Sequence, residues 1–221
     1  MKRRLTKIQQ RRIAGYSNEQ EGSWGLVITH QGSCVKLVDN AGNVFEANLR
    51  NNVGAVVTGD EVLWQNIKAP VIVKLLDRRQ LLKRPDRYKG EKLVAANIDQ
   101  VLIVVANDPI PDLYSLDRYL VALNYYKLPA VIVFHKQDLA APQLVFNTKK
   151  EGGKIILTLD QVIEYYQGLG YQCLRTSVSD PSLKSKVKGK DNILELVDNL
   201  YDKASILVGL SGVGKSSLLN A

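Results

Sequence analysis

The chain has 221 residues, carries a formal net charge of +8 and is 45% hydrophobic. This composition excludes collagen, a wholly disordered chain and a small disulfide scaffold, and the length suits one large or two small domains. No run reaches the roughly 18 apolar residues of a membrane span, and the basic N-terminus lacks the apolar core of a secretory signal.

The positive charge is concentrated in three segments. Residues 1–12 carry +6, residues 78–92 carry +5 and residues 183–190 carry +4, so the rest of the chain is acidic. Clustered Lys and Arg attract nucleic-acid phosphates, which makes a nucleic-acid partner one hypothesis and ordinary solvated loops the other. Residues 1–21 are polar, lack periodicity and are interpreted as a basic tail.

Residues 22–82 contain five short runs with the pattern of β-strands, separated by turn residues. The runs are Trp24–His30, Cys34–Val38, Val44–Asn48, Glu61–Gln65 and Val71–Leu76. Five short strands without a helical period predict a small β-barrel, with an OB-type barrel as the first choice and an SH3-like barrel as the alternative.

A basic linker at residues 83–97 precedes a region of different pattern, residues 98–221. The predicted strands are Val101–Val105, Ala130–Phe134, Cys173–Arg175 and Ser205–Val208, and the predicted helices are Leu113–Tyr126, Val162–Leu169 and Ile193–Leu200. Short apolar strands alternating with helices indicate an α/β domain with a parallel sheet covered on both faces.

The two cysteines, Cys34 and Cys173, lie far apart in the sequence. They predict a reduced, cytoplasmic protein, and with His30 and His135 they do not have the spacing of a four-ligand zinc site.

Residues 209–216 match the phosphate-loop pattern of Gly, four residues, Gly-Lys-Ser, between a predicted strand and a helix start. Glycines let consecutive amides surround phosphates, Lys215 would neutralise phosphate charge, and the Ser216 hydroxyl would hold magnesium. The pattern therefore predicts a nucleoside triphosphate site. Its predicted residues are Gly209, Leu210, Ser211, Gly212, Val213, Gly214, Lys215, Ser216 and Ser217.

The base-reading residues are predicted at the end of another apolar strand, where His135-Lys136-Gln137-Asp138 stands in place of the Asn-Lys-x-Asp of guanine-nucleotide proteins. The Asp138 carboxylate would accept hydrogen bonds from N1 and the 2-amino group of guanine, which adenine cannot offer. We expect His135 to weaken nucleotide affinity while guanine preference is retained. Thr176 and Ser177, after the next strand, resemble the third guanine element, in which a backbone amide meets O6.

The order of these motifs is unusual, because the base-reading residues precede the phosphate loop instead of following it. With the leader at 2–13, Leu82-Lys83-Arg84-Pro85 and Ala95–Gln100, this order resembles the RsgA/YjeQ family of circularly permuted GTPases that depend on the small ribosomal subunit. The resemblance covers almost the whole chain and implies a monomeric, cytoplasmic GTP hydrolase acting late in small-subunit maturation, with GTP and magnesium as ligands.

The resemblance also implies that the tail and barrel contact ribosomal RNA. The tail residues expected to do so are Lys2, Arg3, Arg4, Lys7, Arg11 and Arg12. Lys215 and Ser216 would be the catalytic residues. Members of the family continue with a switch threonine, an Asp-x-x-Gly element and a zinc-binding domain; this chain ends at Ala221, so we interpret it as a GTPase truncated after the phosphate loop, without the zinc ligands.

Two rival interpretations remain open. A non-catalytic RNA-binding fragment with a defective GTPase half would explain His135 and the missing elements. A phosphate-loop ATPase or small-molecule kinase is the third interpretation, and Lys136-Gln137-Asp138 argues against it.

Overall fold

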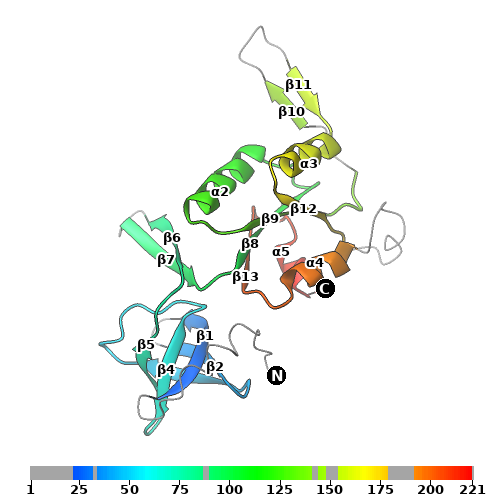
Figure 1. Cartoon of the computed structure of the whole chain (residues 1–221). Helices are drawn as coiled ribbons and strands as arrows, with labels where there is room; N and C mark the ends of the chain where they lie inside the picture. Colours follow the sequence, from blue (N-terminus) through cyan, green and yellow to red (C-terminus); the bar gives the residue numbers. More distant parts are fainter. Residues whose placement is uncertain are drawn as a thin grey trace. The chain divides into compact units, whose positions relative to one another are not determined.

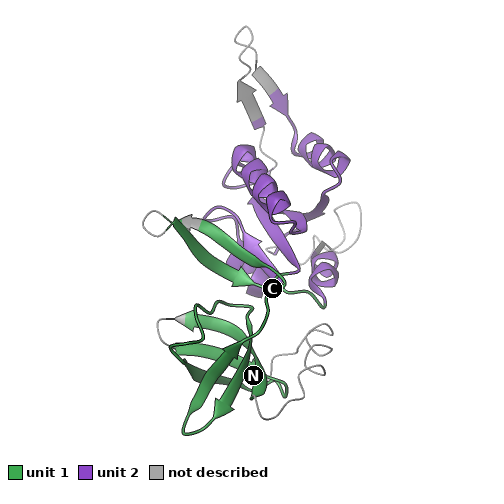
Figure 2. Ribbon diagram, turned by 60° about the vertical axis from the view of Figure 1, so that its left-hand side comes forward, with its two compact units in different colours: residues 1–98, 202–204 green, residues 99–201, 205–221 purple. Residues whose placement is uncertain are grey.

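The chain divides into two compact units, each described here by itself (Figure 2). The first unit comprises residues 1–98 with 202–204, and the second comprises residues 99–201 with 205–221. The structure is a computed structural model and describes residues 22–31, 34–86, 90–140, 144–147, 154–178 and 192–220. The predicted tail and the basic segment at 183–190 lie outside the described residues.

A closed five-stranded barrel forms most of the first unit, with neighbouring strands in the order β1-β2-β3-β5-β4 (Figure 1). The strands are β1 (Ser23–Gln31), β2 (Cys34–Asp39), β3 (Val44–Leu49), β4 (Glu61–Asn66) and β5 (Pro70–Leu75). The pairs are antiparallel except β3 with β5, and pairing of β1 with β4 closes the barrel. The predicted barrel is confirmed, and each strand lies within one or two residues of its predicted place.

Alternating side chains fill the barrel, because successive residues of a strand point to opposite faces. Val35 and Leu37 of β2 pack with Val27, Val62 and Ile72, all fully or nearly fully buried. On the opposite face of β2, Val38 joins a second cluster around the buried Trp24. Both faces of the strands are therefore used for packing.

The segment predicted as a linker forms a β-hairpin of the first unit, β6 (Leu81–Asp86) with β7 (Gly90–Ala96). Its base is hydrogen-bonded to the barrel, since the Ala96 amide donates to the Thr58 carbonyl at 2.9 Å. A Cβ at Gly59, whose φ is +90°, would lie 2.0 Å from the Ala96 oxygen, so glycine is needed where the two segments meet. The division between the units accordingly falls after residue 98, later than the predicted barrel boundary at 82.

The second unit is built on a four-stranded sheet in the order β12-β9-β8-β13, in which every pair is parallel. The strands are β8 (Gln100–Ala106), β9 (Ala130–His135), β12 (Gln172–Arg175) and β13 (Ser205–Val208). Every residue of β8 is buried, as expected for a central strand covered on both faces. This confirms the predicted parallel sheet.

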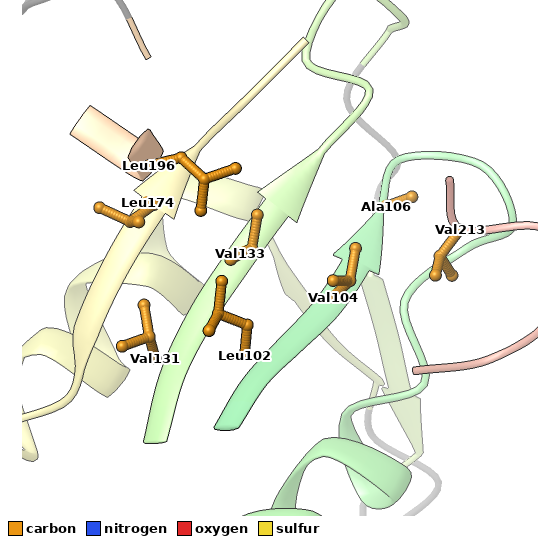
Figure 3. Close-up of a cluster of buried hydrophobic side chains, with 8 residues drawn as sticks. All are labelled: Leu102, Val104, Ala106, Val131, Val133, Leu174, Leu196 and Val213. Atoms are coloured by element: carbon orange, nitrogen blue, oxygen red, sulfur yellow. The ribbon is translucent and has the colours of Figure 1, made fainter. Parts of the chain in front are cut away.

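Helices cover both faces of this sheet. They are α2 (Leu113–Tyr125), α3 (Leu159–Gly168), α4 (Asn192–Leu200) and α5 (Lys215–Asn220). On one face, Leu196 of α4 and Val213, just before α5, pack on side chains of the three strands β8, β9 and β12 (Figure 3). On the other face lies α2, which is joined to α3 by a hydrogen bond from Tyr166 Oη to Asp117 Oδ1 at 2.7 Å.

Two features of this unit were not predicted. A separate hairpin, β10 (Leu144–Asn147) with β11 (Lys154–Leu157), lies between β9 and α3. Helix α3 begins at Leu159, three residues before the predicted start, because Thr158 and Gln161 form a capping box.

Candidate nucleotide-binding site

The predicted site residues lie at one edge of the second unit's sheet. Since all four strands are parallel, their carboxyl ends meet there, and each strand leads directly into a candidate segment. Strand β13 is followed by Gly209, β8 by Asn107, β9 by Lys136 and β12 by Thr176. Segments more than 100 residues apart in sequence are thus brought to one place.

The phosphate loop, residues 209–216, is shaped by its glycines. Gly209, Gly212 and Gly214 have φ values of +149°, +82° and +94°, which side chains rarely allow. A Cβ on Gly209 would lie 2.3 Å from the Val104 carbonyl oxygen, so the backbone at the start of the loop runs too close to β8 for a side chain. Val213, only 2% exposed, anchors the loop in the core.

Lys215 begins α5 and turns back over the loop. Its Nζ donates to the carbonyl oxygens of Gly209 at 3.0 Å and Leu210 at 2.7 Å. The cation is therefore held above the glycine turn, where an anion would be neutralised. Ser216 and Ser217 are exposed on the first turn of α5, so their hydroxyls are open to a ligand.

His135, at the end of β9, is buried between two candidate segments. Its Nδ1 shares a hydrogen bond of 2.9 Å with Thr176 Oγ1. Its opposite edge faces Gly214, where a Cβ would lie 2.5 Å from Cδ2 and 2.8 Å from Nε2. The imidazole thus links the segment after β12 to the phosphate loop, and it fits only because residue 214 is glycine.

The protonation of His135 follows from this position. Burial lowers the pKa of the imidazole below its ordinary value, and this outweighs the opposing effect of the nearby Asp138 carboxylate. His135 is therefore neutral at physiological pH.

Residues 135–139 form a tight turn, referred to below as the 135–139 loop. Lys136 has a φ of +57°, and its Nζ donates to the Asp108 carbonyl at 2.6 Å. The Gln137 amide donates to the Thr176 carbonyl at 3.2 Å, and Ser177 Oγ donates to Asp138 Oδ1. The predicted residues 135–138 and 176–177 are thus in direct contact, with the Asp138 carboxylate oriented by Ser177.

Two residues at this edge were missed by the sequence analysis. Asn107 is 6% exposed, follows β8 directly and hydrogen-bonds to the 135–139 loop, and Asp108 supplies the carbonyl that holds Lys136. They match no motif, and the one available signal is a polar pair directly after the apolar run from Val101 to Ala106.

The remaining sequence predictions are not placed by the described residues. The tail residues between Lys2 and Arg12 lie outside them, as do Lys184 to Lys190. Within the described ranges, no group of three or more His, Cys, Asp or Glu side chains has a metal-binding arrangement, and no helix has the length and apolarity to cross a membrane.

The family model of the RsgA GTPase matches residues 75–221. A protein of Hahella chejuensis (strain KCTC 2396), named small ribosomal subunit biogenesis GTPase RsgA, is 38% identical over 98% of this chain and 58% of its own length. A protein of the same name from Actinobacillus pleuropneumoniae serotype 5b (strain L20) is 35% identical over 99% of this chain and 64% of its own length.

Solved structures give the same picture. The crystal structure of YjeQ from Thermotoga maritima superposes with a TM-score of 0.65 at 31% identity, covering 90% of this chain and 64% of that one. YloQ, a circularly permuted GTPase, superposes with a TM-score of 0.63 at 23% identity, covering 93% of this chain and 66% of that one, which shows a shared fold. The predicted barrel and permuted order are confirmed. This chain spans about three fifths of the length of the curated relatives it matches.

Proposed function

Because the chain belongs to the RsgA GTPase family, we propose that it binds guanine nucleotides, hydrolyses GTP and acts in biogenesis of the small ribosomal subunit in the cytoplasm. The observation that carries the proposal is the meeting of two groups of residues at one sheet edge. A glycine-rich loop with Lys215 lies at the end of β13, and the Asp138 carboxylate lies at the end of the neighbouring strands.

The phosphate loop fits a nucleotide tail. Its left-handed glycines and the Lys215 ammonium suit β- and γ-phosphates. Magnesium, when bound, spreads the charge that develops on the phosphates during hydrolysis. The exposed Ser216 hydroxyl offers the hard oxygen ligand that magnesium prefers.

The guanine preference is assigned to Asp138. Its carboxylate has two oxygens, and Ser177 Oγ donates to Oδ1 while the side chain remains partly exposed. An ionised carboxylate accepts hydrogen bonds from N1 and the 2-amino group of guanine, whereas adenine presents an acceptor at the first position and no donor at the second.

Nucleotide binding by the 221-residue chain tests the guanine assignment. We expect GDP to bind at least about 100-fold more tightly than ADP, and Asp138→Ala to weaken GDP binding by about 100-fold with ADP binding unchanged. Glu164→Ala, a change on the exposed surface of α3, is the control. Equal affinity for GDP and ADP in the unaltered chain would contradict the proposal.

Contact with ribosomal RNA is the second part of the proposal, and the concentration of basic residues supports it. Six cations and no acid lie in residues 1–12. Removal of residues 1–12 should reduce the salt dependence of binding to the small subunit, because fewer counterions are released from RNA phosphates. An unchanged slope would assign the electrostatic contact to other parts of the chain.

A further inference from the structure

Asn107 is a buried asparagine at the proposed nucleotide site. It follows the last residue of β8, Ala106, which is paired in register with His135. Only 6% of its surface is exposed. A buried amide side chain requires hydrogen-bond partners, so the partners of Asn107 indicate what it holds in place.

Every hydrogen bond found for Asn107 goes to the 135–139 loop. Its Nδ2 donates to the Leu139 carbonyl at 2.9 Å, and its Oδ1 accepts from Gln137 Nε2 at 3.2 Å. Its backbone amide donates to the His135 carbonyl at 3.3 Å. The two side-chain bonds therefore reach the residues on either side of Asp138.

The loop needs such support because its backbone is strained. Lys136 has a φ of +57°, a conformation uncommon for a residue other than glycine, and one that persists when surrounding contacts impose it. The Leu139 amide donates to the Lys136 carbonyl at 3.0 Å and closes the turn, while the Leu139 carbonyl is held by Asn107.

We propose that Asn107 is a positioning residue for guanine recognition, which places the Asp138 carboxylate by holding Gln137 and Leu139. The inference rests on the proposed function, because it concerns the same base-binding site. Asn107 acts through the Gln137 side chain and the Leu139 carbonyl and does not itself contact the nucleotide.

The test compares GDP with inosine diphosphate, whose base lacks the 2-amino group. Both ligands use the phosphate loop equally, so the ratio of their dissociation constants reports the geometry of the Asp138 carboxylate alone. In the unaltered chain we expect GDP to bind about tenfold more tightly, the effect of one hydrogen bond to a charged group. Asn107→Ala should reduce this ratio to about one.

Asn97 provides a matched control in the other unit. It is 4% exposed, its Nδ2 donates to the Gly59 carbonyl at 3.0 Å, and its Oδ1 accepts from the Arg79 amide at 2.8 Å. Asn97→Ala should lower stability and leave the GDP to inosine diphosphate ratio unchanged. A purely structural role for Asn107 predicts the same behaviour at position 107.

The outcomes separate the two proposals. If the unaltered chain binds GDP no better than inosine diphosphate or ADP, the guanine assignment itself fails. If it prefers GDP and Asn107→Ala retains the ratio, the positioning role is overturned. Should Asn107→Ala prove unfolded, Asn107→Asp keeps the size and the acceptor for Gln137 but removes the donor to Leu139. It should then show the reduced ratio, and a retained ratio would overturn the inference.

Discussion

The phosphate loop and the 135–139 loop lie at the same sheet edge but are held in place by different means. The phosphate loop follows from its own backbone, with glycines at 209, 212 and 214 in conformations that other residues rarely adopt. The 135–139 loop contains no glycine and is held by partners from other strands, among them Asn107, Thr176 and Ser177. The first loop is therefore determined locally and the second by tertiary contacts.

His135 and Gly214 are in contact and connect the two loops. Of the changes considered for this contact, Gly214→Ala is expected to lower stability the most. The new methyl group would meet the His135 ring, which is confined by its bond to Thr176. Overpacking costs about 1–3 kcal/mol and the left-handed backbone of an alanine about 1–2 kcal/mol. Thermal unfolding should therefore show that the free energy of unfolding falls by about 2–5 kcal/mol. GDP binding should weaken as well.

Gly170→Ala is the matched control for this change. Gly170 has a φ of +89°, close to the +94° of Gly214, but a Cβ there would meet nothing within 4 Å. The Gly170→Ala variant therefore measures the backbone strain alone, and its affinity for GDP should equal that of the unaltered chain. Equal loss of stability in the two variants would mean that the ring does not constrain the phosphate loop. In Gly214→Ala combined with His135→Ala, the clash should disappear.

A smaller effect is expected from pH. Burial keeps the pKa of His135 in the folded chain below its ordinary value near 6.5, whereas the unfolded chain protonates at that value. As the pH falls below about 6.5, the unfolded state binds more protons than the folded state, and stability decreases until the folded pKa is passed. Above about pH 7, His135 is neutral in both the folded and the unfolded chain, so it makes no contribution to the pH dependence of stability.

Thermal unfolding between pH 5 and 7.5 measures this effect, with His135→Asn as the reference. The other histidine, His30, is present in both proteins, so the difference between them isolates residue 135. Between pH 7.5 and pH 5, we expect the Tm of the unaltered chain to fall by up to a few degrees more than the Tm of the His135→Asn variant. Parallel curves would show that the imidazole titrates alike in the folded and unfolded chain.

Much of the fold could be predicted because local signals agreed with the final structure. Five short strand-like runs separated by turn residues predicted the barrel, and the apolar run from Val101 to Val105 predicted a covered strand of a parallel sheet. The segment predicted as a linker is the β6–β7 hairpin, whose many charged residues are equally typical of a solvated linker. The capping box of Thr158 and Gln161 is a local signal that places the start of α3 before the predicted one.

At the site, the phosphate loop could be predicted from the sequence alone, because its glycine positions, Lys215 and Ser216 form a local pattern with a local backbone shape. The sequence also indicated Asp138 and Ser177 by their places after apolar strands, but not that Ser177 donates to the Asp138 carboxylate. How His135 is accommodated, and which residues hold the 135–139 loop, depends on contacts between distant segments of the fold. Asn107 is 28 to 32 residues from the loop that it contacts. Such contacts depend on which strands are neighbours in the sheet, and the spacing of residues along the chain does not show which strands these are.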